Sequence, residues 1–167
     1  LVVIAQPTVS IVTNVGPAHL EFFKTLDNVA REKVTLIRNV PATGRVILSV
    51  DDQFADWMAQ QTRAEVIRIT GSGGDFARSA AVSVAAWFDV PFDQATAAAA
   101  SWTPPPGRLI ELAGLNHSTI IDDTYNANPS SMTLALNTAR NRAKQSAATR
   151  LIVVLGDMLE LGDESER

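Results

Sequence analysis

The sequence has no cysteine among its 167 residues, and this absence removes several kinds of chemistry. Without thiols, disulfide bridges, zinc sites with cysteine ligands and thiol catalysis are excluded. Long apolar runs are also missing, because no stretch reaches the length of about 18 residues that a membrane span needs. The opening LVVIA is too short for a signal peptide. We therefore expect a cytoplasmic protein with no membrane partner.

A surplus of basic residues is lacking too, since 14 Lys and Arg stand against 18 Asp and Glu, for a formal charge of −4. Nucleic-acid-binding domains carry clustered Lys and Arg, so no nucleic-acid partner is expected. The chain is long enough for one ordinary domain or two small ones with a buried core. It opens inside an apolar run without methionine and closes at LGDESER, where a helix starts. We expect it to be part of a longer protein.

Strands and helices alternate along the chain, which predicts an α/β layered fold. Runs rich in β-branched residues predict strands at 7–15, 45–50 and 65–70. Helices are predicted at 25–40, with Thr25 or Asp27 near the start, and at 75–90 and 91–102.

The segment TPPPGR at 103–108 is the strongest boundary, because consecutive prolines cannot continue a helix and form a stiff, extended linker. After it, residues 109–114 and 118–123 are expected to pair as a hairpin. A helix is predicted over 130–144, with Ser130 or Ser131 as its N-cap. The apolar run 150–157 is predicted to be a buried strand of the parallel-sheet kind.

Lys33 stands in an unusual place on the predicted helix 25–40. At about 100° per residue it falls in the middle of an apolar face that holds Leu26, Val29, Ala30, Val34 and Ile37. An isolated ammonium is costly to bury, so this lysine must reach solvent, find a partner or be chemically modified. The pattern alone favours a lysine that reaches solvent at the edge of a helix contact.

Three polar loops follow predicted strands directly, where ligands of α/β sheets gather. The first holds His19 and Glu21, which can serve a divalent cation, although a loop histidine more often makes an ordinary hydrogen bond. The third, VLGDMLELGDES, holds Asp157 and Glu160. The glycine-rich GSGG at 71–74 is not a phosphate loop, because no Lys-Ser or Lys-Thr follows it.

The second loop, IIDDTYNANPSSM at 120–132, is the richest in polar groups. Its aspartates could hold hydroxyls or a metal, and the amides that open the next helix could receive an anion. A capped turn is the alternative, because Asx residues favour turns for local reasons. Two carboxylates and two amides exceed what one cap needs, which favours a functional site.

Four stretches, in family order, resemble the ATP-dependent Mur ligases of bacterial cell-wall synthesis: VTNVGPAHLEFFKTLDNVAREKVTLI, PPPGRLIEL, IIDDTYNANPSSMTLAL and VVLGDMLELGDES. DDTYNANP is the most specific, and with GDMLELG it is closest to the members that add D-alanyl-D-alanine to UDP-N-acetylmuramoyl-tripeptide. The resemblance implies part of a P-loop-type central ATP-binding domain at 1–103 and a linker at 104–107. The first part of a Rossmann-like C-terminal domain would follow at 108–167.

The resemblance also implies roles for single residues. His19 and Lys33 would be catalytic and would ligate Mg²⁺, Lys33 as a carbamate. ATP would be contacted by Asn14, Arg108, Asp123, Asn126 and Asn128. The incoming amino acid or dipeptide would lie near Asp157 and Glu160.

The implied reaction is amide ligation with ATP and Mg²⁺ as cofactors, by a protein that is a monomer when complete. ATP would phosphorylate the carboxylate of UDP-N-acetylmuramoyl-tripeptide, and the amine of D-Ala-D-Ala would attack the acyl phosphate. The family's P-loop would lie before Leu1, so the 167-residue chain alone is expected not to turn over ATP.

The sequence departs from the family pattern in two places. Ser49 stands where the family usually has asparagine, and GSGG replaces some tens of residues and a Gly-x-His-x-x-x-Asn motif. Two alternatives therefore stay open. One is another Mur-fold ligase, such as a folylpolyglutamate or cyanophycin synthetase, which DDTYNANPSSM disfavours. The other is a non-catalytic α/β module without a P-loop.

Overall fold

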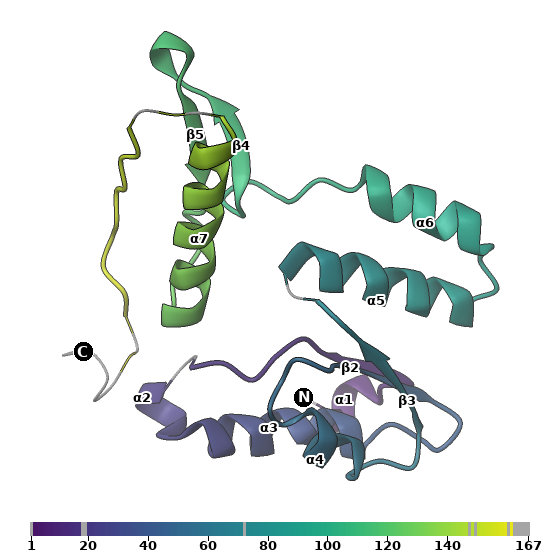
Figure 1. The fold of residues 1–167 in the computed structure, drawn as a ribbon. Coiled ribbons are helices and arrows are strands. Elements are labelled where there is room, and N and C mark those ends of the chain that lie inside the picture. The colour runs from purple at the N-terminus through teal and green to yellow at the C-terminus, as the bar shows by residue number, and fades with distance from the viewer. Residues whose placement is uncertain are drawn as a thin grey trace. The chain divides into compact units, whose positions relative to one another are not determined.

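The computed structural model describes residues 2–17, 20–71, 73–146, 148, 150–159 and 161. The chain divides into two units, the first made of residues 1–16 and 25–102 and the second of residues 17–24 and 103–167 (Figure 1). The first unit contains a three-stranded sheet and the second a two-stranded one. The alternation of helices and strands expected from the sequence is confirmed.

The first unit is built on a parallel sheet in the order β1-β2-β3, with bounds Val9–Val12, Arg45–Ser49 and Glu65–Ile69. Ile47 of the central strand pairs with Ile11 on one side and with Ile67 on the other. Strand β2 is buried from Val46 to Ser49, because a parallel strand is covered on both faces. Strand β1 is shorter than the predicted 7–15, since residues 13–15 leave the ladder to form a loop.

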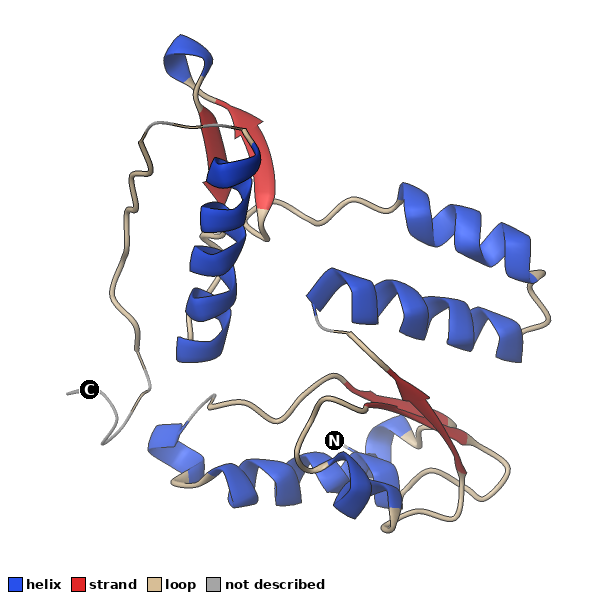
Figure 2. Ribbon diagram, in the orientation of Figure 1, coloured by secondary structure: helices blue, strands red, loops and turns tan. Residues whose placement is uncertain are grey.

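Helices cover both faces of this sheet (Figure 1). On one side lie α3 (Leu26–Arg38) and α4 (Ala55–Ala59), and on the other lies α5 (Gly73–Trp87). Of the two predicted starts, Thr25 is the N-cap of α3, and its hydroxyl accepts from the Asn28 N–H. On the α5 side, Ile47 and Ile69 pack against Phe76 and Ala80. Helix α6 (Phe92–Ser101) packs along α5, and the short α1 (Val2–Ala5) precedes β1 (Figure 2).

The second unit contains the predicted hairpin, with β4 (Ile110–Ala113) and β5 (Thr119–Asp122) antiparallel. The strands meet in the turn η1 (Leu115–His117), where Asn116 and His117 both have positive φ, 52° and 62°. Helix α7 (Pro129–Gln145) is tied to β4 by an ion pair of 2.7 Å between Arg142 and Glu111. The short α2 (Leu20–Phe23) belongs to the same unit.

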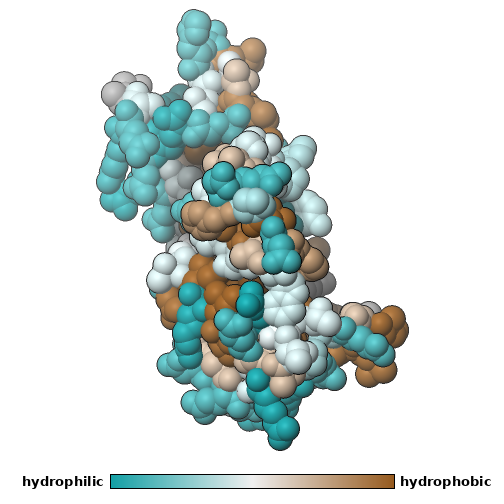
Figure 3. Space-filling view, turned by 90° about the vertical axis from the view of Figure 1, so that its right-hand side faces the viewer, coloured by the Kyte–Doolittle hydropathy of each residue, from teal (hydrophilic) through white to brown (hydrophobic). Residues whose placement is uncertain are grey.

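The prediction of a buried strand at 150–157 is wrong for this chain. The described residues 150–159 form no strand, and the apolar side chains from Leu151 to Leu155 are exposed, Val154 to 91%. A strand needs neighbours to pair with its backbone, and the described part of the second unit has only a hairpin whose strands pair with each other. Figure 3 views the molecule from the right-hand side of Figure 1, away from this run, and shows other apolar side chains, in brown, at the surface.

Helices long and apolar enough to traverse a membrane do not occur in the part of the chain that the structure describes.

Candidate functional site

In the first unit, Lys33 of α3 reaches the loop that follows β1. Its Nζ donates to the backbone carbonyl oxygen of Asn14, 2.6 Å away. The side chain is half-buried, between the buried Ala30 and Val34 of the same helix. Of the possibilities left open by the sequence, the structure therefore shows a lysine that has a partner. The contact lies at the carboxyl end of a parallel strand, where α/β proteins place ligands.

Asp52 follows the central strand and holds the same loop. One carboxylate oxygen accepts from the Val15 N–H, and the other accepts from the Phe54 N–H at 2.8 Å. Its neighbour Asp51 accepts from the Gly71 N–H at 2.9 Å, at the end of β3. The two aspartates thus tie together the loops after all three strands. Sequence reasoning assigned them no role, although two carboxylates directly after a predicted strand were the available signal.

The burial of Lys33 lowers the pKa of its ammonium below the ordinary 10.5, and the negative charge of Asp52 opposes that shift. At any pH below 10.5, Lys33 therefore carries a larger share of neutral amine than an ordinary lysine does. A neutral amine is the form that can attack an electrophile such as carbon dioxide.

Two of the predicted site residues, His19 and Glu160, lie outside the described residues. The described part of the chain contains no group of three or more His, Asp or Glu side chains that could hold a metal ion. As an ammonium that donates to Asn14, Lys33 cannot ligate a cation either. The described residues therefore do not by themselves fit magnesium.

In the second unit, the structure brings Arg108 and Asp123 together at the start of the hairpin. The Leu109 N–H donates to Asp123 Oδ1 at 3.2 Å, and the Tyr125 N–H donates to the carbonyl of Gly107 at 3.1 Å. The Arg108 guanidinium lies over the Tyr125 ring, 3.9 Å from its centroid. The backbone thus joins the end of the linker to the turn that carries the predicted nucleotide contacts.

Asn126 and Asn128 have local partners in the same turn. Asn126 Oδ1 accepts from the Ala127 N–H at 2.8 Å. Asn128 is the N-cap of α7, and its Oδ1 accepts from the Ser131 N–H at 2.8 Å in a reciprocal capping box. The prediction that Ser130 or Ser131 caps this helix is therefore wrong. Pro129 explains the shift, because its fixed φ suits the first helical position directly after an N-cap.

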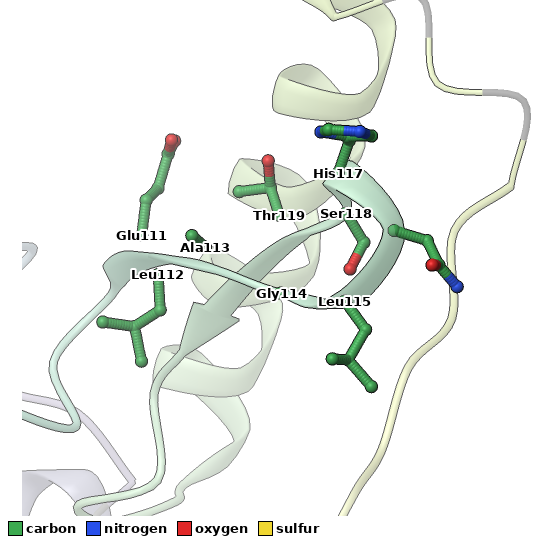
Figure 4. Close-up of a pocket in the computed structure, with 9 residues that line it drawn as sticks. Glu111, Leu112, Ala113, Gly114, Leu115, His117, Ser118 and Thr119 are labelled. Carbon is green, nitrogen blue, oxygen red and sulfur yellow. The ribbon is translucent and has the colours of Figure 1, made fainter.

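Asp157 lies in the exposed segment after α7. Its carboxylate forms no hydrogen bond or ion pair with any other residue of the described ranges. The hairpin residues Glu111–Thr119 line an open surface depression, with Glu111 and Leu112 on opposite sides of the strand (Figure 4). None of the predicted site residues lines it, so we assign this depression no role in the site.

Comparison with known families agrees with this architecture. The Mur ligase middle domain matches residues 1–90, and the Mur ligase glutamate ligase domain matches residues 107–167. The chain therefore belongs to the Mur ligase family. The expected fold class, part of a central Mur ligase domain followed by part of a C-terminal one, is confirmed.

Relatives with a stated activity match along nearly the whole chain. The UDP-N-acetylmuramoyl-tripeptide--D-alanyl-D-alanine ligase of Mycobacterium tuberculosis (strain ATCC 25618 / H37Rv) is 30% identical, over 97% of this chain and 40% of its own length. The enzyme of the same name from Escherichia coli (strain K12) is 27% identical, over 98% of this chain and 44% of its own. The chain thus spans less than half the length of these relatives.

Solved structures share the fold. MurF from Acinetobacter baumannii superposes with a TM-score of 0.77 at 24% identity, over 97% of this chain and 42% of that one. MurF ligase from Thermotoga maritima in complex with ADP gives the same TM-score at 20% identity, over 99% of this chain and 45% of that one.

Proposed function

We propose that this chain is part of an ATP-dependent ligase that joins D-Ala-D-Ala to UDP-N-acetylmuramoyl-tripeptide in peptidoglycan synthesis. The observation that carries the proposal is the match, over 97–99% of the chain, to enzymes that bear the name of this activity, from seven strains. Within the ligase, residues 1–103 would be the later part of the central ATP-binding domain. Residues 104–107 would be the linker, and residues 108–167 the first part of the C-terminal domain.

Several polar side chains of the second unit could bind ATP. The Arg108 guanidinium is exposed and can donate to phosphate oxygens. Among the described residues, Asp123 accepts through Oδ1 alone, from the Leu109 N–H, which leaves Oδ2 for a ribose hydroxyl. Asn126 and Asn128 have side-chain N–H donors in the same turn. Asn14 is proposed as an ATP contact on the family resemblance alone. ATP, when bound, would supply the phosphoryl group that activates the substrate carboxylate. Arginine donors would stabilise the negative charge that develops.

Lys33 would act after modification. Its neutral Nζ would attack the carbon of carbon dioxide, forming a C–N bond and losing one proton, so that a carbamate anion replaces the ammonium. The lowered pKa of Lys33 favours this reaction. Of the forms of Lys33, only the carbamate supplies an oxygen ligand, and together with His19 it would contribute to a Mg²⁺ site.

The remaining assignments concern the acceptor side and the cell. Asp157 and Glu160 would lie near the incoming D-Ala-D-Ala. We place the complete ligase in the cytoplasm, as a monomer, and expect the 167-residue chain to be inactive without the P-loop.

The test is a ligation assay with the complete protein, ATP, Mg²⁺, UDP-N-acetylmuramoyl-tripeptide and D-Ala-D-Ala. We expect amide product and phosphate in equal amounts, only when both substrates are present.

Lys33→Ala should abolish ligation, and acetate should partly restore it by occupying the vacated anion site. Lys33→Arg should not restore it, because a guanidinium stays cationic. Ligation of glutamate to a folate instead, or near-normal turnover of Lys33→Arg, would contradict the proposed substrate or the carbamate respectively.

A further inference from the structure

In the Arg108–Tyr125 contact, the tyrosine ring holds the Arg108 guanidinium without occupying the hydrogen-bond donors of that guanidinium. The guanidinium lies over the ring with 3.9 Å between its central carbon and the ring centroid, so it meets the ring by its face. Among the residues that the structure describes, it forms no hydrogen bond or ion pair. A guanidinium carries its five N–H donors in its own plane, around its edge. Stacking therefore fixes the group and leaves the edge open to an anion.

The backbone around this contact is also fixed. Gly107 is buried and has a φ of 76°, and a Cβ on it would lie 3.0 Å from the Tyr125 nitrogen. The positive φ together with this tight approach favours glycine, whose conformation lets the Tyr125 N–H reach the Gly107 carbonyl. Leu109, the residue after Arg108, donates its backbone N–H to the Asp123 carboxylate. Arg108 thus lies between two residues held by hydrogen bonds, Gly107 through its carbonyl and Leu109 through its N–H. The Tyr125 ring contacts the Arg108 side chain.

We infer that Tyr125 is a positioning residue, which holds the Arg108 guanidinium by its face so that the edge donors meet the phosphates of the nucleotide. The inference rests on the proposed function, in which Arg108 binds those phosphates. A carboxylate partner would hold Arg108 equally well but would occupy the donors that a phosphate needs. The aromatic ring performs the same task without competing. Tyr125 as a residue is 67% exposed, which fits a contact at the surface better than a place in the core.

The stacking itself can be tested on the 167-residue chain, because Tyr125 is its only tyrosine. Chain labelled with 3-fluorotyrosine should give one ¹⁹F resonance, which Arg108→Gln should shift. The exposed Arg140 of α7 provides the matched control, and Arg140→Gln should leave the resonance in place. In proton NMR, the ring current should move the Arg108 Nε–H, and Tyr125→Leu should remove that displacement while Tyr125→Phe keeps it. An unchanged ¹⁹F resonance in Arg108→Gln would overturn the inference.

The functional consequence is tested by kinetics of the complete ligase. A cation–π contact at an exposed site contributes about 0.5–1 kcal/mol, so Tyr125→Leu should raise the KM for ATP about two- to fivefold. The KM for D-Ala-D-Ala should stay unchanged, and Tyr125→Phe should behave like the wild type. If Arg108→Gln does not raise the KM for ATP, the proposed phosphate role of Arg108 fails. If Arg108→Gln raises it and Tyr125→Leu does not, the positioning role of Tyr125 fails alone.

Discussion

Two opposing effects act on the charge state of Lys33. Its helix places it beside apolar neighbours, where an ammonium loses solvation, while the Asn14 carbonyl and the charge of Asp52 favour that same ammonium. Burial is the larger of the two effects on the pKa, so the neutral form gains. The residue is therefore poised between a cation held by the loop and an amine able to react.

This balance predicts a pH profile for chemical modification. Because the pKa of Lys33 is lowered from 10.5, its neutral fraction exceeds that of an ordinary lysine at each pH below that value. Acetic anhydride does not titrate and acetylates neutral amines, so its rate with Lys33 should reach a plateau at a lower pH than its rates with Lys24 and Lys144, the other two lysines. Peptide mass spectrometry over a pH series measures all three in one sample.

The control for this profile is Asp52→Asn, which removes the charge that raises the pKa of Lys33 and keeps one of the two acceptor oxygens that Asp52 offers to the Val15 and Phe54 N–H groups. Its profile should move to still lower pH. Each lysine is compared by the midpoint of its profile, because the half-buried Lys33 can react slowly at every pH. A Lys33 midpoint equal to that of Lys24 would contradict the burial argument.

At the scale of elements, the turn of the β4–β5 hairpin is not optimal in sequence. Two successive residues with positive φ are typical of a type I′ turn, in which Asn-Gly is strongly favoured and histidine is strained at the second position. His117→Gly should therefore stabilise the hairpin by about 0.5–1 kcal/mol. Amide exchange of β4 and β5 measures the change. His117→Ala is the matched control and should give no gain, and an equal gain in both variants would contradict the turn argument.

Helix α7 offers a way to separate a cap from a ligand contact. Asn128→Ala removes the capping box and should destabilise the helix by about 1 kcal/mol in denaturant unfolding. Asn128→Ser should keep the cap, because serine is an equally good N-cap, but it loses the amide donors proposed for ATP. Loss of ATP affinity in Asn128→Ser at unchanged stability would support the ligand contact. Normal ATP affinity in that variant would limit Asn128 to its role as a cap.

The elements differ in how well the sequence predicts them. The helix at 26–38 and the hairpin were predictable, because periodic burial and turn chemistry are local properties. The N-cap at Asn128 was missed, although Asn before Pro was a readable signal. The role of Asp52 could not be derived, because the Val15 N–H that donates to its carboxylate belongs to the loop after β1, 37 residues away. The run 151–155 was wrongly predicted to be a strand. Its apolar composition is typical of a buried strand, but a strand forms only where a neighbouring strand pairs with its backbone.

At the scale of the whole molecule, burial is distributed unequally between the units. The buried apolar side chains of the described residues all belong to the first unit, between Val12 and Ala95. The second unit has a hairpin, one long helix and an exposed apolar run. A hairpin with so little buried surface is marginal in water. We expect the first unit to hold most of the stability of this chain.

Amide hydrogen exchange should reveal this inequality and test the exposed run. Amides of β2 should exchange most slowly, those of β4 and β5 faster, and those of 151–155 without measurable protection, because no strand pairs with them in the described structure. In the proposed complete ligase we expect the exchange of 151–155 to slow by at least about tenfold, since so apolar a run is stable in a folded protein only when covered. Helix α7, ordered in both forms, is the internal reference. Equally fast exchange of 151–155 in the proposed complete ligase would show that this run is a surface segment. Burial would then not explain why the run is apolar.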